Sequence, residues 1–233
     1  MTMLIWVMLS IAQADSMQTL VLASDSTSTV EEREAAFAEV VRSGSTEIQY
    51  LIDVASDSTQ STRLRWVAIR ALGQIRGPQA ETVLIKMLND PEPAIRTAAV
   101  SALGDFGKIE YTSMIGRFLK DDAVIVRVAA AESLGKLGDV KAISMLEAAL
   151  NDPSNQYRGS SLWVRAHYTM ALGIIGNSKA YPVLLECLAD GDVRVVQSAV
   201  VALEKTAGFS LGDGRSSDEE VEAWSRWVQN QIK

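Results

Sequence analysis

The sequence predicts an all-α fold: a solenoid of about five stacked helical hairpins, closed by a C-terminal capping helix. Three observations support this prediction. A ten-residue pattern recurs along the chain, a short apolar segment with an acidic turn precedes most copies, and the composition is aliphatic. Hydrophobic residues account for 48% of the 233 residues, and aromatic residues for only 6%. Recurrence at a period of about 20–50 residues is typical of repeat proteins, whose stacked units share one continuous core.

The N-terminal residues predict export. Residues 3–9 are an apolar run, and residues 12–14 read Ala-Gln-Ala. Such a run before Ala-x-Ala is typical of a cleaved secretory signal and is too short to span a bilayer. We therefore expect residues 1–14 to be a signal peptide and the mature chain to be periplasmic or extracellular, with no stable membrane span. Met1 and Thr2 carry no positive charge, so a hydrophobic first helix in a cytoplasmic protein is the alternative.

The next segment leads into the repeats. Residues 15–28 are rich in Ser, Thr and Asp, and we expect a linker or an N-terminal cap there. Thr29 and Glu32 then have the spacing of a capping box, which opens a helix. The repeats extend from there over residues 29–207.

The repeated pattern is Val-Arg-x-x-Ala-x-x-Ala-Leu-Gly with conservative variation. Its copies occupy residues 64–73, 95–104, 126–135 and 164–173, and a fifth, residues 195–203, has Val196 in place of the arginine. The arginines Arg65, Arg96, Arg127 and Arg165 follow one another at spacings of 31, 31 and 38 residues. A weaker half-match places Arg33 at 32 residues before Arg65.

A short apolar helix is expected ahead of the later copies. These first helices cover residues 83–88, 115–119, 146–150 and 183–188, and each leads into a turn with an aspartate: Asp90, Asp121, Asp152 and Asp190. The repeated pattern itself forms the second helix of each hairpin. We expect that helix to end near its glycine, because glycine suits a C-terminal cap.

The helical period places the apolar positions of the pattern on one stripe. The residue before the arginine, the first alanine and the leucine fall within about 80° of one another at 100° per residue. A single hairpin cannot bury this stripe, so neighbouring hairpins must cover it. The arginine lies on the flank, where its stem is covered and its guanidinium stays polar.

This pattern resembles HEAT repeats, in particular the short bacterial repeats of phycobilisome lyases. The resemblance covers residues 29–207 and implies a right-handed, armadillo-like superhelix. It also implies a polar ladder between repeats, made by the turn aspartates and the arginines. By position the implied pairs are Asp90 with Arg96, Asp121 with Arg127, and Asp152 with Arg165. Asp190 faces Val196, so the ladder is expected to lapse in the last repeat.

Two segments depart from the repeat. Asn151–Trp163 holds the insertion that lengthens one interval, and its Tyr157, Arg158 and Trp163 are residue types favoured at interfaces. An idle surface loop is the alternative. Residues 208–233 are expected to form a loop and a capping helix opened by Ser217 and Glu220. The tryptophans of that helix either close the end of the stack or form a partner site.

Composition and motifs argue against catalysis and metal binding. One Cys cannot form an intramolecular disulfide, and one Cys with one His cannot make a zinc site of the Cys/His type. A net charge of −7 disfavours a nucleic-acid partner, which needs a basic face. His167 has no recognisable catalytic companion, and Cys187 lies in an apolar helix. We therefore expect no catalytic residue, no metal and no cofactor.

The remaining candidate site is the face of the second helices opposite the apolar stripe. In solenoids of this kind these helices line the concave side. The face is nearly neutral and holds apolar residues, which favours a protein-binding groove. Its predicted contact residues are Trp66, Arg70, Thr97, Ser101, Val128, Glu132, Met170 and Val201.

The sequence thus predicts a non-catalytic scaffold or adaptor that binds a protein or peptide along this face. Two alternatives stay open: a chromophore-lyase-like enzyme or accessory factor, and a purely structural module of an envelope assembly. The sequence does not specify an oligomeric state.

Overall fold

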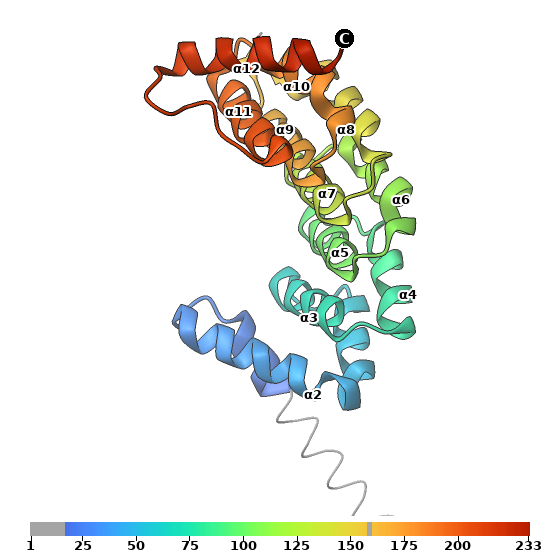
Figure 1. The fold of residues 1–233 in the computed structure, drawn as a ribbon. Coiled ribbons are helices and arrows are strands. Elements are labelled where there is room, and N and C mark those ends of the chain that lie inside the picture. The colour runs from blue at the N-terminus through green and yellow to red at the C-terminus, as the bar shows by residue number, and fades with distance from the viewer. Residues whose placement is uncertain (1–16, 158–159) are drawn as a thin grey trace, which may run out of the picture. The chain divides into compact units, whose positions relative to one another are not determined.

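The computed structural model describes residues 17–157 and 160–233, and it shows an all-α solenoid of helical hairpins (Figure 1). The predicted fold class is thereby confirmed. The predicted signal peptide, residues 1–14, lies outside the described residues. The chain divides into two compact units, Met1–Phe106 and Gly107–Lys233.

The first unit contains α2 (Val30–Ser56), α3 (Thr62–Ile75), α4 (Pro78–Met87) and α5 (Pro93–Phe106). Residues 17–24 are also helical, and Leu20 within them is fully buried, so this segment is packed rather than a loose linker. The predicted capping box at Thr29 and Glu32 opens α2.

The second unit begins with short helical pieces in place of one first helix. These are η1 (Ile109–Tyr111), α6 (Thr112–Gly116) and η2 (Arg117–Lys120). Longer helices follow: α7 (Val124–Leu137), α8 (Ala142–Leu150), α9 (Val164–Ile175), α10 (Tyr181–Leu188), α11 (Val193–Ala207) and α12 (Ser217–Gln231). None of the described helices combines the length and hydropathy needed to cross a bilayer.

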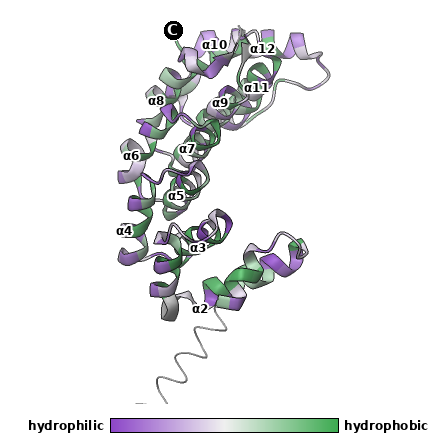
Figure 2. Cartoon of the chain, turned by 180° about the vertical axis from the view of Figure 1, so that it is seen from behind, coloured by the Kyte–Doolittle hydropathy of each residue, from purple (hydrophilic) through white to green (hydrophobic). Residues whose placement is uncertain are grey.

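The predicted apolar stripe forms the core of both units. The repeat leucines Leu72, Leu103, Leu134, Leu172 and Leu203 are all 0% exposed. Hydrophobic and hydrophilic stretches alternate along the helices, as the colours of Figure 2 show. This alternation follows from the helical period, which brings every third or fourth side chain to the same face.

The repeat glycines do not cap the second helices, contrary to expectation. The second helices that contain a repeat glycine continue past it, and Gly138 and Gly176 supply left-handed caps three residues later in α7 and α9. Gly208 caps α11, which has Glu204 in place of a repeat glycine. The repeat glycines instead allow close helix packing. A Cβ at Gly73 would lie 2.7 Å from the Cβ of Ala102, and a Cβ at Gly173 would lie 2.5 Å from the Cα of Ala202.

The polar ladder exists, but its pairing differs from the implied one. Asp90 pairs with Arg65, the arginine of the preceding hairpin, at 2.5 Å, and both side chains are buried. Arg96 does not pair with Asp90 in the implied manner: it donates to the main-chain oxygens of Asp90 and Pro91 at 2.9 and 3.0 Å. The carboxylate of Asp90 therefore accepts its hydrogen bond from the arginine of the preceding hairpin, and not from the arginine of the hairpin to which its turn belongs.

The same offset extends the ladder to the last repeat, where the expected lapse is wrong. Arg165 contacts both carboxylate oxygens of Asp190, at 3.2 and 2.6 Å, rather than Asp152. Its Nε also donates to the carbonyl of Leu150 at 3.1 Å, as the Nε of Arg65 donates to that of Ala55 at 3.0 Å. These two rungs thus have one geometry: a buried guanidinium binds the next turn's carboxylate and a preceding main-chain carbonyl.

The insertion weakens the ladder in the repeat that it interrupts. Arg127 donates to the main-chain oxygen of Asp121 at 3.0 Å, while its buried Nε has no hydrogen-bond partner in the described part of the chain. Asp152 turns instead toward the inserted loop and accepts from the backbone of Ser154 at 2.9 Å. The hydrogen bonds from Ser154 are the main reason why the pKa of Asp152 is lowered.

The inserted loop is fixed to the unit by a buried asparagine. It contains η3 (Pro153–Asn155) and a two-stranded hairpin, β1 (Gln156–Tyr157) and β2 (Ser160–Ser161). Asn155 donates to the carbonyl of Ala149 at 2.9 Å and accepts from Tyr168 at 3.4 Å. The loop therefore fills space within the unit as well as covering its surface.

The C-terminal helix covers the end of the second unit. Its capping box is formed by Ser216 and Glu219, one residue earlier than expected. Trp224 and Val228 are fully buried. Phe209 stacks on Trp224 with ring centroids 5.4 Å apart, and α12 packs against α10 and α11. This aromatic cluster closes the apolar stripe.

The close packing at the repeat glycines is testable with Gly173→Ala. Overpacking costs about 1–3 kcal/mol, and the better helix propensity of alanine returns about 1 kcal/mol. Because the new Cβ would meet backbone, which cannot swing aside, we expect an overpacking cost near the upper value and a net loss of about 2 kcal/mol. Urea denaturation measures this change. Gly191→Ala is the control, because a Cβ at that position would meet no described atom within 4 Å and its φ is not in the left-handed region. Equal stability of both variants would contradict the packing role.

The buried rung is testable by comparing two Arg→Ala substitutions. Arg165→Ala removes the cation that pairs with Asp190 and leaves this carboxylate with the main-chain N–H of Asp192, and we expect a loss of about 3 kcal/mol. Arg42→Ala removes an exposed pair with Glu39 and should cost less than about 1 kcal/mol. Thermal and urea unfolding measure the stability of both variants. Similar losses of stability would show that the buried pair of Arg165 and Asp190 stabilises the fold no more than an exposed pair does.

Candidate functional site

The first unit contains a groove made of two adjoining pockets. Their volumes are about 580 and 350 Å³, and Trp66 and Arg70 line both. The larger pocket lies among residues 17–24, α2, α3 and the start of α5, and the smaller one lies between α3 and α5. We call these two pockets together the α3 groove.

Four predicted contact residues line the α3 groove. Trp66 and Arg70 come from α3, and Thr97 and Ser101 occupy the corresponding positions of α5. Their spacing of four residues places each pair on one helix face, opposite the buried stripe. The structure therefore brings the first half of the predicted row together at one depression.

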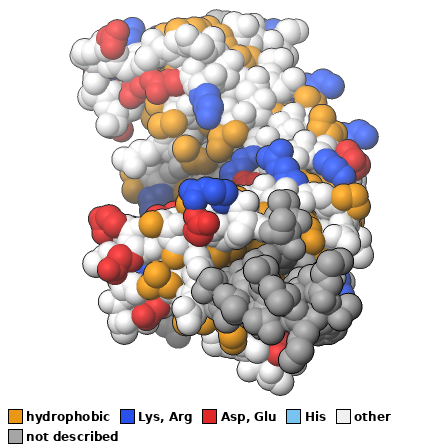
Figure 3. Space-filling model, turned by 90° about the horizontal axis from the view of Figure 1, so that it is seen from below, with side chains coloured by type: hydrophobic (Ala, Val, Ile, Leu, Met, Phe, Trp, Pro, Cys, Tyr) orange, Lys and Arg blue, Asp and Glu red, His pale blue; other side chains and the backbone are white. Residues whose placement is uncertain are grey.

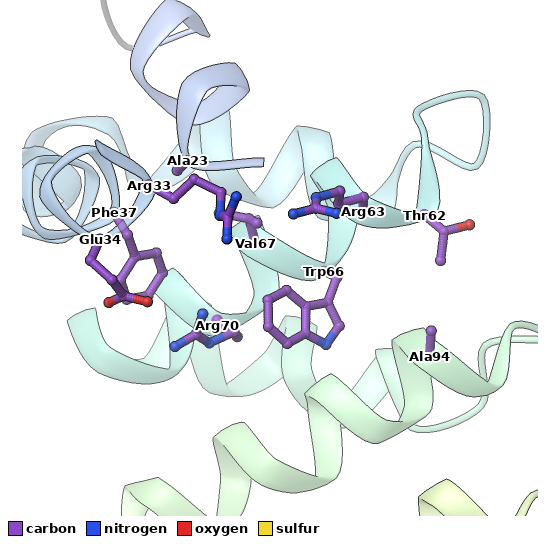
Figure 4. A pocket seen from close by; sticks show the side chains of 10 residues that line it. All are labelled: Ala23, Arg33, Glu34, Phe37, Thr62, Arg63, Trp66, Val67, Arg70 and Ala94. Carbon is purple, nitrogen blue, oxygen red and sulfur yellow. The ribbon is translucent and has the colours of Figure 1, made fainter. Parts of the chain in front are cut away.

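Arg70 is held between two aromatic rings. Its guanidinium carbon lies 4.5 Å from the ring centroid of Phe37 and 4.7 Å from that of Trp66 (Figure 4). Guanidinium groups stack favourably on aromatic faces, and stacking leaves the N–H groups at the edge of the plane available to other partners. The two rings thus fix the orientation of Arg70.

Sequence reasoning missed the contribution of α2 to the α3 groove. Arg33, Glu34 and Phe37 line the larger pocket from α2, and Arg63 lines it from the first turn of α3. The half-match at Arg33 is the one sequence signal that α2 carries a repeat-like helix. Figure 3 shows basic side chains gathered beside hydrophobic ones on the face that it presents.

The predicted row in the second unit does not line a comparable depression among the described residues. Val128 is only 8% exposed, so its expected role as an exposed apolar contact is wrong. Met170 and Val201 are exposed at 37% and 45%, and Glu132 is exposed. None of these side chains lines the small pocket of the second unit that lies among Arg165, Cys187 and Asp190.

The inserted loop places one of its three predicted contact residues on the surface. Trp163 is exposed, and its ring and that of His167 form a T-shaped pair with centroids 5.2 Å apart. Arg158 and the side chain of Tyr157 lie outside the described residues. His167 also approaches Glu132 with its Nδ1 at 3.2 Å from the carboxylate.

His167 and Cys187, the two candidate reactive side chains, do not form a catalytic arrangement within the part of the chain that the structure describes. Cys187 is buried and contacts the hydroxyl of Thr169 at 3.6 Å. Burial raises the pKa of the Cys187 thiol to about 11, which suppresses the reactive thiolate. The described residues also contain no group of three or more His, Cys, Asp or Glu side chains suited to a metal.

Comparisons with known proteins agree with the repeat pattern. The family model for HEAT repeats matches residues 48–114 and 110–163, and the model for the PBS lyase HEAT-like repeat matches residues 164–190. No curated protein matches the chain in a sequence search.

Solved structures share the fold at low sequence identity. The complex of CpcE and CpcF of phycocyanin lyase from Nostoc sp. PCC7120 gives a TM-score of 0.50 at 17% identity, covering 91% of this chain and 94% of that one. The Escherichia coli protein YibA gives a TM-score of 0.59 at 21% identity, covering 80% of this chain and 69% of that one. These similarities concern the fold alone.

The buried thiol gives a direct test of the environment of the chain's single cysteine. At pH 8 a thiol with a pKa near 11 is ionised in only about one molecule in a thousand, so N-ethylmaleimide should label native protein at least about a hundredfold more slowly than urea-unfolded protein. The folded pKa lies above the ordinary value of 9.0, so this group's contribution to stability is present below pH 9 and lost as the pH rises through 11. Equal labelling of folded and unfolded chains would contradict the assignment.

Proposed function

Because the chain belongs to the HEAT-repeat proteins, we propose that it is a non-catalytic scaffold that binds a segment of a partner protein in the α3 groove. The observation that carries this proposal is the continuity of the groove across two successive second helices, with Trp66 and Arg70 shared by both pockets. Extended surfaces built from successive repeats are what solenoids offer to partners.

The lining of the α3 groove supports a protein partner. Trp and Arg are the residue types that carry most binding energy at protein interfaces. Here Trp66 and Arg70 lie at the centre of the groove, and Arg70 is already ordered by two rings. A side chain fixed before binding loses less conformational entropy when the partner arrives.

A lyase-like enzyme or accessory factor is the second candidate. The PBS lyase HEAT-like repeat model covers residues 164–190, which include His167, and His167 lies 3.2 Å from Glu132. A repeat shared by a lyase does not carry its chemistry, because function depends on the site rather than the fold. If this chain transferred a chromophore through that pair, His167→Ala would abolish the transfer.

We also propose that the mature protein is exported, which rests on the apolar run and the Ala-x-Ala motif within residues 1–14. Its partner is then a periplasmic or extracellular protein. A purely structural role in an envelope assembly would need no discrete groove partner, so dependence on Trp66 separates the two proposals.

Site-specific photo-crosslinking in the producing cells tests the scaffold proposal. A benzophenone side chain at Thr97, inside the groove, should yield a discrete adduct with a partner protein. The same probe at Gln79, an exposed position on α4, is the control and should not yield that adduct. Adding Trp66→Ala should reduce the Thr97 adduct at least about tenfold, since a central aromatic residue is removed. The proposal fails if both positions give the same adducts, if neither gives one, or if Trp66→Ala has no effect.

A further inference from the structure

The larger pocket of the α3 groove has a charge opposite to that of the whole chain. The chain carries a net charge of −7, whereas the ten residues that line this pocket include three arginines and a single carboxylate, Glu34. A basic depression in an acidic protein favours anionic groups on the partner over cationic ones. The arrangement of the arginines shows what kind of anion fits.

Arg70 is fixed in place with its hydrogen-bond donors unused. The rings of Phe37 and Trp66 cover its guanidinium. Among the described residues, Arg70 forms no hydrogen bond and no ion pair. A guanidinium held in this way presents a planar fork of N–H groups, which matches the two oxygens of a carboxylate.

Arg63 supplies a second unused fork on the same pocket. It is exposed, and within residues 17–157 and 160–233 it has no hydrogen-bond or ion-pair partner. The negative charge of Asp25 interacts with Arg63 at a distance. The Asp25 carboxylate accepts hydrogen bonds from Thr27 and Ser28 and none from Arg63. Figure 4 shows the charged end of Arg63 directed toward that of Arg33.

Arg33 is partly committed to the protein itself. Its Nη1 donates to the main-chain oxygen of Ser28 at 2.5 Å, which holds the segment before α2 against the helix. Glu34 brings one negative charge to the pocket wall. The three arginines of this pocket thus face two carboxylates, Glu34 on its wall and Asp25 near Arg63, and this small excess of positive charge suits one or two carboxylates rather than a dense polyanion.

The smaller pocket has a different chemistry. Beyond Trp66 and Arg70 it is lined by Gln74, Thr97, Ser101 and Asp105 together with small alanines. The amide and hydroxyl groups there both donate and accept hydrogen bonds, whereas the carboxylate of Asp105 only accepts them. A partner segment therefore meets basic and aromatic groups at one end of the groove and mostly neutral polar groups at the other.

We propose that the α3 groove recognises an acidic peptide segment of a partner protein: Asp or Glu side chains bound at Arg63 and at Arg70, beside an apolar residue packed on Trp66. The inference rests on the scaffold function proposed above. Capture of the carboxylate gives the groove its selectivity, and the aromatic contact contributes affinity.

Fluorescence anisotropy with the full chain tests this inference. The probe is a labelled peptide of alternating Glu and Ala with one central Leu, compared with matched peptides in which Gln or Lys replaces every Glu. We expect the Glu peptide to bind at least about tenfold more tightly than the Gln peptide, and the Lys peptide to bind more weakly still. Free glutamate at the same concentration should not compete, because it lacks the apolar contact.

Three variants assign the effect to the groove. Arg63→Gln and Arg70→Gln should each weaken binding of the Glu peptide at least about fivefold, whereas Arg42→Gln, an exposed arginine on α2 that does not line either pocket, should leave it unchanged. Arg63 is exposed, so its substitution is not expected to disturb folding. A thermal melting curve of Arg70→Gln checks that this substitution also leaves the fold intact.

The outcomes separate this inference from the scaffold proposal. Equal binding of the Glu and Gln peptides, or equal effects of Arg42→Gln and Arg63→Gln, overturns acidic recognition. If the Thr97 crosslink persists in Arg63→Gln and Arg70→Gln but is lost in Trp66→Ala, the scaffold function holds and the acidic inference is wrong. If no peptide binds and Trp66→Ala does not alter the crosslink, both fail.

Discussion

The close approach of neighbouring second helices is the constraint on which the remaining structure depends. Gly73 faces Ala102 and Gly173 faces Ala202 at distances that leave no room for a further methyl group. Helices that approach this closely bury the leucines of the stripe completely, because a protein interior tolerates few voids. The spacing also sets the reach of the arginines, so that Arg65 and Arg165 each meet an aspartate of the following turn.

Sequence periodicity predicts the core well and the contacts between hairpins poorly. The stripe residues follow from 3.6 residues per turn, a local property that needs no knowledge of neighbours. The role of Gly73 depends on Ala102, which lies on another helix, and a glycine near a helix end fits a cap equally well. The ladder pairing fails for the same reason: sequence identifies arginines and aspartates, but the stacking decides which hairpin supplies each partner.

In the α3 groove, too, the residues set by the local repeat pattern are predictable from sequence, whereas contacts between different helices are not. Trp66, Arg70, Thr97 and Ser101 are predictable because they occupy equivalent positions of successive repeats. α2 matches the repeat pattern only at Arg33, and this partial match does not predict that Arg33 lines a pocket. Nothing local indicates that Phe37 stacks on Arg70. The helical angle of Val128 alone predicts a surface position, whereas burial depends on what the surrounding structure covers.

The C-terminal helix has a consequence for assembly. A stack of repeats with an open apolar end can add another copy of itself in a head-to-tail contact, and repeated contacts of that kind grow into filaments instead of closed oligomers. In the second unit Trp224 and Val228 occupy that end and are fully buried. The polar face of α12, whose first turn contains Asp218, Glu219 and Glu220, is turned toward solvent at this end of the unit. The helix therefore covers an apolar surface through which copies of the chain could otherwise stack end to end.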